Sequence, residues 1–278
     1  MTTVAFIGLG VMGQLMAANL TREYTVRSFD PNGKGNCKSA RDAAKGADVL
    51  ITMVPDGDAV REAVLDALPA LKPGAVVVDM SSSDPAGTRA LGLALSKNHV
   101  SMVDAPVSGA RFKAKDGTLA IMVGGEKAPV EKVMPVLRKL GTAIFHVGPL
   151  GAGHAVKALN NYLGAAGTLA GFEALLIAEA FGLDPEPMLE AINASTGRNS
   201  TTARKIPQEV LTGAFNSGFK LALMTKDVGI AAELARGLKV KAPFLKETLK
   251  HWRAAQKKLP READHTEIYK YQKKLTRR

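Results

Sequence analysis

A glycine-rich turn close to the N-terminus limits the possible folds of this chain more than any other feature. Residues 4–8 form a short apolar run of strand length, and Gly8-Leu9-Gly10-Val11-Met12-Gly13 continues directly from it. Between a strand and a helix, glycines at this spacing allow a tight turn, the approach of a diphosphate to the backbone, and close packing of the helix on the strand. Asp30 lies 22 residues after Gly8, where the next apolar run ends. This arrangement predicts a dinucleotide-binding βαβ unit.

Short apolar runs and helical patterns alternate through the first 150 residues. Such alternation predicts an α/β domain of the Rossmann type, in which a doubly wound parallel sheet carries helices on both faces. The expected strands cover residues 4–8, 24–29, 49–54, 75–79 and 100–104, and the expected helices cover residues 11–20, 58–71 and 85–95.

The second part of the chain has helical periodicity and no strand signal. Residues 151–183 form one apolar pattern long enough to cross a membrane, but the polar residues near one end and several glycines favour the core helix of a larger domain. Further helices are expected at residues 185–195, 202–212, 221–237 and 243–257. We therefore predict a dinucleotide-binding domain over residues 1–150 and an all-helical domain over residues 151–278.

Charge and composition narrow the class of partner. The 278 residues carry a net charge of +11, and residues 239–278 alone hold thirteen Lys and Arg against four Asp and Glu. Since this region lacks zinc or helix-turn-helix spacing, we expect a solvated helical end and no nucleic-acid partner. A single cysteine, Cys37, excludes an internal disulfide and a thiolate metal cluster, and no metal is expected. The N-terminus begins with a strand instead of a signal peptide, which favours a cytoplasmic protein without membrane attachment.

Loops that follow the predicted strands are expected to border ligands, because a doubly wound sheet binds them at the carboxyl ends of its strands. Val54-Pro55 begins one such loop. Ser81-Ser82-Ser83 forms another, where the hydroxyls suit ligand contact and capping of the helix from Pro85 equally well. In a third, Ser108 and the amide of Gly109 offer two donors for a carboxylate, unless this segment is a plain turn.

A regular spacing marks the start of the long helix. Gly153, Lys157 and Asn161 recur every four residues, and Asn160 lies on an adjoining face. A lysine among apolar residues is costly to bury in its charged form, so its pKa is expected to fall toward neutrality, as general acid–base chemistry requires. The alternative is a lysine whose amine reaches solvent near the helix start.

Three glycines farther along the same helix, Gly164, Gly167 and Gly171, predict close contact with another backbone. Each glycine destabilises a helix by roughly 1 kcal/mol relative to alanine, which such a contact would offset. The contact lies either within this chain or with a second subunit.

In their order, these motifs resemble the β-hydroxyacid dehydrogenase family, which includes 3-hydroxyisobutyrate dehydrogenase and tartronate semialdehyde reductase. The resemblance covers nearly the whole chain. The residues that carry it are Phe6-Ile7-Gly8-Leu9-Gly10-Val11-Met12-Gly13, Asp79-Met80-Ser81-Ser82, Asp104-Ala105-Pro106-Val107-Ser108-Gly109, Gly117-Thr118-Leu119, Gly125, the G-x-x-x-K-x-x-N-N run from Gly153 to Asn161, and Lys226-Asp227.

The resemblance implies hydride transfer between a nicotinamide cofactor and a short β-hydroxy acid or its semialdehyde. It implies a homodimer or homotetramer, with the helical domain serving substrate binding and oligomerisation. It identifies Lys157 and Asn161 as catalytic. The substrate-binding residues that it implies are Ser108, Gly109, Asn160 and Asn161, and the cofactor-binding residues are Gly8, Leu9, Gly10, Val11, Met12, Gly13, Asp30, Val54, Pro55, Ser82 and Lys226.

The chain departs from the family pattern after Gly109. Ala110 stands where a second glycine is usual, and Arg111, Phe112 and Lys113 follow it. We expect Arg111 to bind an additional anionic or hydroxyl-rich end of the substrate, because an Arg fork matches oxyanions. Exposure to solvent is the alternative.

NAD is the expected cofactor, with NADP as a weaker substitute. Asp30 is placed to accept hydrogen bonds from the adenosine ribose and to repel a 2′-phosphate, and Pro31 supplies no charge. The loop of residues 32–36 is expected to be flexible. Lys34 in this loop, and Lys38 and Arg41 after it, are expected to lie within reach of a 2′-phosphate.

Two other functions stay open. Imine reductases share this fold but generally lack a lysine at the position of Lys157. A non-catalytic, DNA-associated relative would use the fold as an oligomeric scaffold and would also have lost the lysine. The basic C-terminal region is the feature that keeps this alternative open.

Overall fold

The computed structural model describes residues 2–276 and divides the chain into two compact units, Met1–Lys157 (unit 1) and Ala158–Arg278 (unit 2). Unit 1 is an α/β unit of the Rossmann type and unit 2 is helical, which confirms the predicted fold class. The boundary between the units falls inside helix α7 (Ala152–Phe181).

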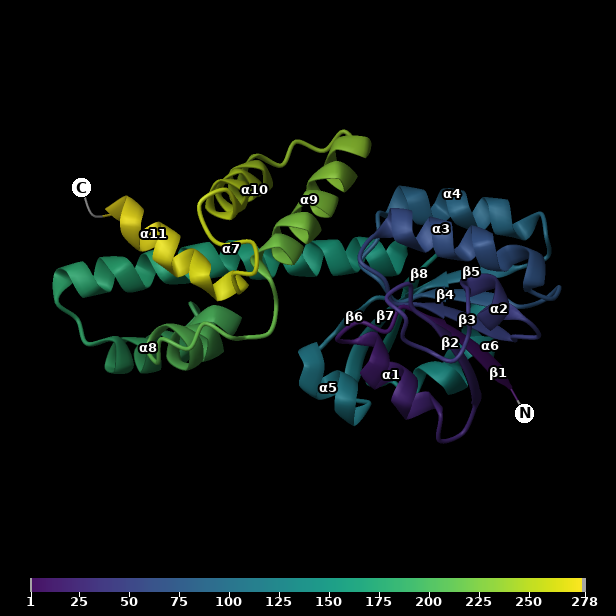
Figure 1. Ribbon diagram of the computed structural model, residues 1–278. Coiled ribbons are helices and arrows are strands. Elements are labelled where there is room, and N and C mark those ends of the chain that lie inside the picture. The colour runs from purple at the N-terminus through teal and green to yellow at the C-terminus, as the bar shows by residue number, and fades with distance from the viewer. Residues whose placement is uncertain (1, 277–278) are drawn as a thin grey trace. The chain divides into compact units, whose positions relative to one another are not determined.

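The sheet of unit 1 is mixed (Figure 1). Its strand order is β2-β1-β3-β4-β5-β7-β6, and β8 pairs with β7. The five predicted strands correspond to β1–β5, and these are parallel. The chain then turns back, so that β7 runs antiparallel to β5 and β6, while β8 is parallel to β7. The strands are β1 (Thr3–Ile7), β2 (Thr25–Phe29), β3 (Val49–Thr52), β4 (Val76–Asp79), β5 (Ser101–Asp104), β6 (Val107–Ser108), β7 (Leu119–Gly124) and β8 (Gly141–Gly148).

Side chains that alternate along the parallel strands pack into two cores, one on each face of the sheet. In β1, Val4 and Phe6 belong to the core under α1 (Gly13–Leu20) and α6 (Lys127–Leu137). Ala5 and Ile7 belong to the core on the other face. That second face is covered by α2 (Ala40–Ala44), α3 (Gly57–Ala67) and α4 (Pro85–Ser96). Since β1–β5 are parallel, the loops that follow them gather at one edge of the sheet.

The helices of unit 2 pack around four fully buried side chains, Phe172, Leu175, Trp252 and Ile268. The predicted helices are present, with one difference: the helix predicted at residues 202–212 is a π-helix, η2, which spans Thr201–Val210. A final helix after residue 267 was not predicted. After α7 the elements are α8 (Pro185–Asn193), η2 (Thr201–Val210), α9 (Leu221–Gly237), α10 (Pro243–Gln256), η3 (His265–Glu267) and α11 (Ile268–Thr276).

Helix α7 is the one helix among residues 2–276 that is long and apolar enough to cross a membrane. Phe172 and Leu175 are fully buried in the core of unit 2, so α7 is a core helix, as predicted. Gly171 is closely packed, because a Cβ there would lie 2.9 Å from Thr201 Cγ2 of the same chain, but this neighbour is a side chain and not the predicted backbone. A Cβ on Gly164 would meet no described atom within 4 Å.

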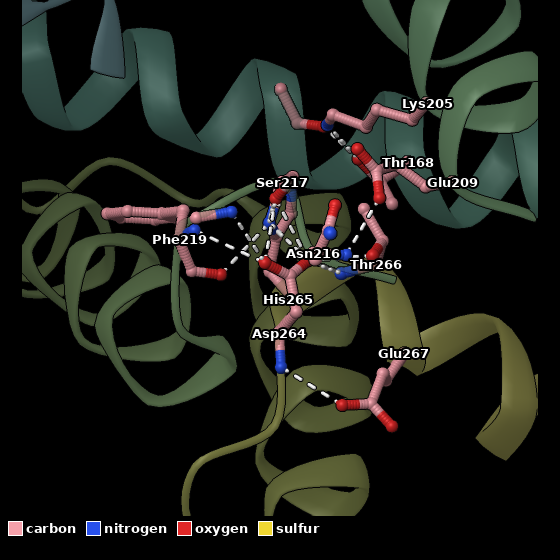
Figure 2. A network of polar contacts seen from close by, with 12 residues as sticks. Thr168, Lys205, Glu209, Asn216, Ser217, Phe219, Asp264, His265, Thr266 and Glu267 are labelled. Atoms are coloured by element: carbon pink, nitrogen blue, oxygen red, sulfur yellow. Dashed lines mark hydrogen bonds and ion pairs between the residues drawn. The ribbon is translucent and has the colours of Figure 1, made fainter. Parts of the chain in front are cut away.

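A polar network fixes the loop that leads into α9 (Figure 2). The carboxylate of Asp264 accepts hydrogen bonds from Ser217 Oγ at 2.9 Å and from the amides of Gly218 and Phe219 at 3.0 and 3.2 Å. Burial works to raise the pKa of Asp264, but hydrogen bonds from His265 and Thr266 outweigh it and hold that pKa far below its usual range. The start of α9 is therefore tied to the segment that opens α11.

The basic C-terminal region is partly neutralised within unit 2. Lys273 Nζ lies 3.1 Å from Glu179 Oε2, and Lys270 Nζ lies 2.7 Å from Glu267 Oε2. Tyr269 is buried and donates to Glu179 Oε1 at 2.9 Å. This segment is thus a packed helix as well as a charged one.

Candidate active site

The three glycines of the first turn have three different surroundings. Gly8 has φ +96°, and a Cβ there would lie 2.3 Å from the carbonyl oxygen of Met53. A Cβ on Gly13 would lie 2.0 Å from the carbonyl oxygen of Gly8, which shows how closely α1 approaches the turn. Around Gly10, by contrast, no described atom lies within 4 Å of such a Cβ. The turn therefore fits a dinucleotide: two glycines are needed by the fold, and the third leaves open space for a diphosphate.

Asp30 is part of this turn as well as of the predicted ribose site. Its side chain is 7% exposed, and Oδ2 accepts a 2.7 Å hydrogen bond from the amide of Leu9. Oδ1 accepts from the amide of Asn32 at 2.9 Å. Burial works to raise the pKa of Asp30, but these amides and the charge of Lys34 lower it overall. The carboxylate thus stays ionised and holds the glycine turn in place, a role that sequence reasoning missed.

The segment after Asp30 folds back on β2, where Phe29 and Gly35 pair as an isolated antiparallel bridge. Asn36 Oδ1 accepts from the amide of Ser28 at 2.7 Å, and Asp30 donates its amide to the carbonyl of Lys34 at 3.0 Å. Arg41 is engaged elsewhere, with Nε 3.2 Å from the carbonyl oxygen of Asp66.

Two of the three serines after β4 face inward. Ser81 Oγ accepts from the amide of Val54 at 3.0 Å, and Ser83 Oγ donates to Asp79 Oδ2 at 2.7 Å. Neither caps the following helix, because Asp84 does so by accepting from the amide of Gly87. Ser82 is half-buried between them.

The loop after β3 borders the glycine turn. Val54 Cγ1 lies 2.9 Å from where a Cβ on Gly8 would stand, and Pro55 is exposed beside it. The structure therefore brings Val54 to the same edge as the glycines, as the strand order requires.

The turn after β6 has a strained backbone. Gly109 has φ +142°, and a Cβ there would lie 2.6 Å from Lys113 Cδ, so the lysine stem covers this glycine. Ala110, at the start of α5 (Ala110–Asp116), has φ +55°, a conformation that favours glycine. Ser108 is half-buried, and both Arg111 and Lys113 are exposed. Two positive charges therefore lie just beyond the predicted carboxylate-binding turn.

The first turn of α7 lies directly against the strands. A Cβ on Gly153 would come within 2.2 Å of the carbonyl oxygen of Met122 in β7 and 3.0 Å of that of Asp104 in β5. Glycine is thus required for this approach. Lys157 follows one turn later and is half-buried.

In unit 2, the two asparagines of the motif differ. Asn161 is 7% exposed and donates from Nδ2 to Asp227 Oδ2 at 2.5 Å, whereas Asn160 is exposed and donates to Asn161 Oδ1 at 3.1 Å. Lys226 Nζ lies 3.4 Å from Asp227 Oδ1. Sequence reasoning noted the Lys226-Asp227 pair but missed that Asp227 orients Asn161.

Two family models divide the chain between them. Residues 3–148 match the NAD binding domain of 6-phosphogluconate dehydrogenase, and residues 151–272 match the NAD-binding model of NADP-dependent 3-hydroxyisobutyrate dehydrogenase. A 2-(hydroxymethyl)glutarate dehydrogenase of Eubacterium barkeri is 38% identical over 87% of this chain and 85% of its own length. The chain belongs to the β-hydroxyacid dehydrogenase family.

Other members of the β-hydroxyacid dehydrogenase family agree with this assignment over a greater length. An NAD-dependent L-serine dehydrogenase of Pseudomonas aeruginosa is 35% identical over 97% of both chains. The structure of a Mycobacterium tuberculosis 3-hydroxyisobutyrate dehydrogenase with L-serine superposes with a TM-score of 0.91, at 32% identity, and covers 98% of this chain and 99% of its own. Like its family, the chain is an NAD(P)-linked oxidoreductase of hydroxy acids.

Proposed function

We propose that this enzyme interconverts a short β-hydroxy acid and its semialdehyde with NAD, and that Lys157 transfers the proton. The observation that supports this most directly is the position of α7. Its first turn touches the ends of β5 and β7 through Gly153, which lies one helical turn before Lys157. Ligands of such sheets bind beyond the carboxyl ends of the strands.

A nicotinamide cofactor held at the glycine turn would supply one half of the chemistry, the exchange of hydride with the hydroxyl-bearing carbon. Lys157 supplies the other half. In oxidation its amine accepts the proton of the substrate hydroxyl as the carbonyl forms, and in reduction its ammonium returns that proton to the carbonyl oxygen. A positioned acid–base group of this kind contributes about 10²–10⁴ in rate.

The substrate carboxylate is assigned to Ser108, the amide of Gly109 and Asn161. A hydroxyl, a backbone amide and a side-chain amide all donate to an anion. Asn160, which donates to Asn161, is assigned to orienting the lysine and its neighbour.

The dinucleotide is assigned to the glycine turn, Asp30, Val54, Pro55, Ser82 and Lys226. In this assignment residues 1–150 form the dinucleotide-binding domain and residues 151–278 the substrate-binding and oligomerisation domain. NAD is preferred because the ionised carboxylate of Asp30 repels a 2′-phosphate, and Arg41 is already engaged with Asp66.

A second anionic group on the substrate would explain why an arginine stands at position 111. It lies two residues after Gly109 on an exposed turn of helix, and Lys113 covers that glycine. The 38% identical relative takes its name from a hydroxymethyl dicarboxylate. We therefore include β-hydroxy dicarboxylates in the substrate class.

The enzyme is further proposed to be a cytoplasmic homodimer or homotetramer. Leu163 and Ile177 are exposed on one face of α7, 68% and 69% respectively, and Phe181 continues this face at 81%. An apolar stripe of this length favours burial against another subunit. Leu163→Glu combined with Ile177→Glu should then yield monomers in analytical ultracentrifugation, and an unchanged sedimentation coefficient would reject this interface.

A cofactor-linked screen tests the proposed reaction. Short β-hydroxy acids, β-hydroxy dicarboxylates, L-serine and the matching semialdehydes are each offered with NAD or NADP, and nicotinamide absorbance is followed. We expect turnover with at least one β-hydroxy acid. Activity with cyclic imines alone would favour the imine reductase alternative, and salt-dependent DNA binding without turnover would favour the scaffold alternative.

A further inference from the structure

Two buried carboxylates lie next to each other at the end of the sheet in unit 1. Asp79 ends β4 and Asp104 ends β5, and the two residues are directly paired in the register of these parallel strands. Both are 0% exposed. Since neighbouring strands are about 4.8 Å apart, the two carboxylates repel each other unless polar neighbours compensate.

Asp79 accepts hydrogen bonds from Thr52 Oγ1, the amide of Ser81 and Ser83 Oγ. His154, from the first turn of α7, lies beside both carboxylates. Its Nε2 lies 3.5 Å from Asp79 Oδ2, and its Nδ1 lies 3.7 Å from Asp104 Oδ2 and 2.9 Å from Thr88 Oγ1. The residue is 1% exposed, and Nε2 has no hydrogen-bond partner among the described residues. The imidazole is therefore a polar group shared by the two strand ends.

Asp104 also holds the backbone of α7. Its Oδ1 accepts from the amide of Gly151 and its Oδ2 from the amide of His154, both at 2.7 Å. The first amides of a helix have no partner within the helix, so Asp104 caps α7 from a distant strand. Asp104 is tightly packed, because a Cβ on Gly124 would lie only 2.4 Å from Asp104 Oδ1.

We infer that Asp79, Asp104 and His154 form an anchor that positions Lys157. This rests on the proposed role of Lys157 as acid and base. Lys157 follows His154 by three residues, so a shift of the first turn of α7 moves the lysine with it. A misplacement of about 1 Å can cost about 10² in rate. The three anchor residues are buried against one another, so they are positioning residues and not catalytic residues.

The first test removes the imidazole. His154→Leu keeps a similar size but offers no polar atom to the carboxylates. We expect kcat to fall by about 10- to 100-fold, while the KM of the hydroxy acid and the Kd of NAD, measured by fluorescence, change less than about threefold. His154→Gln keeps a polar group and should recover most of kcat. Val60→Ala in the buried face of α3 is the control, because it lowers Tm without touching α7.

The second test is a double-mutant cycle with Lys157→Ala. If His154 acts through Lys157, His154→Leu should cost less than about twofold in kcat once the lysine is absent. An equal loss in both backgrounds would show a general structural effect and overturn the inference, as would wild-type kcat in His154→Leu alone. If Lys157→Ala itself keeps full kcat, the proposed role of the lysine fails, and the anchor has nothing catalytic to position.

Discussion

Asn161 and Asp227 are joined by a 2.5 Å hydrogen bond from the asparagine Nδ2 to the aspartate Oδ2. Both side chains are buried, at 7% and 3% exposed, although 66 residues separate them in the chain. The bond fixes which way the Asn161 amide points, because the donor end faces Asp227 and the acceptor end receives Asn160. Asp227 is therefore expected to control substrate binding without contacting the substrate.

Asp227→Ala tests this relationship. Loss of a hydrogen bond to a charged group is worth about 1.5–3 kcal/mol, so we expect KM for the hydroxy acid to rise by roughly 10- to 100-fold. Because Asp227 also lies 3.4 Å from Lys226, which is assigned to the cofactor, the Kd of NAD should change as well but by less than the KM. Asp227→Asn should recover part of both losses. Glu233→Ala, on the exposed side of the same helix, is the control. A lower Tm with an unchanged KM would show that the bond serves stability only.

Lys157→Ala tests the proton transfer. We expect kcat to fall by about 10²–10⁴ while NAD binding survives, because the glycine turn and Asp30 are untouched. Steady-state rates and a fluorescence titration with NAD provide the two measurements. Partial recovery on addition of ethylamine would support the amine as the missing group. A variant with near wild-type kcat would remove Lys157 from the mechanism.

Arg111→Ala tests recognition of a second anion. We expect KM for a β-hydroxy dicarboxylate to rise about tenfold, whereas KM for a three-carbon β-hydroxy acid should stay within about twofold. Lys115→Ala is the matched control, since it removes an exposed positive charge from the same short helix. Equal effects on both substrates would point to general electrostatic attraction.

The ratio of kcat/KM for NAD and NADP tests the role of Asp30. We expect a preference for NAD of about ten- to a hundredfold, because the carboxylate repels a 2′-phosphate. Asp30→Asn should narrow the preference, and Lys34→Ala should widen it by removing an exposed positive charge. A wild-type preference for NADP would show that the lysines after β2 outweigh the carboxylate.

Lys205 gives a prediction about pH and stability. Burial and the nearby Arg204 lower the pKa of Lys205 to about 8, and its amine lies 2.6 Å from Thr168 Oγ1 (Figure 2). Between pH 8 and 10 the folded state therefore binds fewer protons at this lysine than the unfolded state, so stability rises with pH. Lys205→Met should raise the free energy of unfolding at pH 7, and this gain should shrink by about 1–2 kcal/mol at pH 9.5. Urea titrations at both pH values measure it, and a gain independent of pH would contradict it.

The features that could be predicted from sequence are those that depend on local sterics. Gly8 and Gly13 are glycines because neighbouring carbonyl oxygens leave no room for a Cβ, and the spacing alone indicated this. The five parallel strands followed from continuous apolar runs, which burial on both faces requires. Ala110 could be singled out because glycine is usual there, and its φ of +55° supplies the reason.

The features that escaped prediction depend on distant partners or weak patterns. β8 alternates poorly between buried and exposed residues, so it has no clear strand signal. The π-helical form of η2 is not visible in a 3.6-residue period, and Pro207 lies inside it. Asp104 and His154 form their contacts across 50 residues, and an aspartate at the end of each of two neighbouring strands was the only hint.

Helix α7 also constrains how the gene for this enzyme can change. The helix has 30 residues and runs without interruption through Lys157, Asn161 and Phe172. Each residue advances an α-helix by 100° and about 1.5 Å, so deleting one codon between these positions would turn all later side chains away from their present neighbours. This part of the helix can accommodate single substitutions, but it cannot accommodate a change in its length. Over this stretch we expect homologous enzymes to vary in composition and to keep the same number of residues.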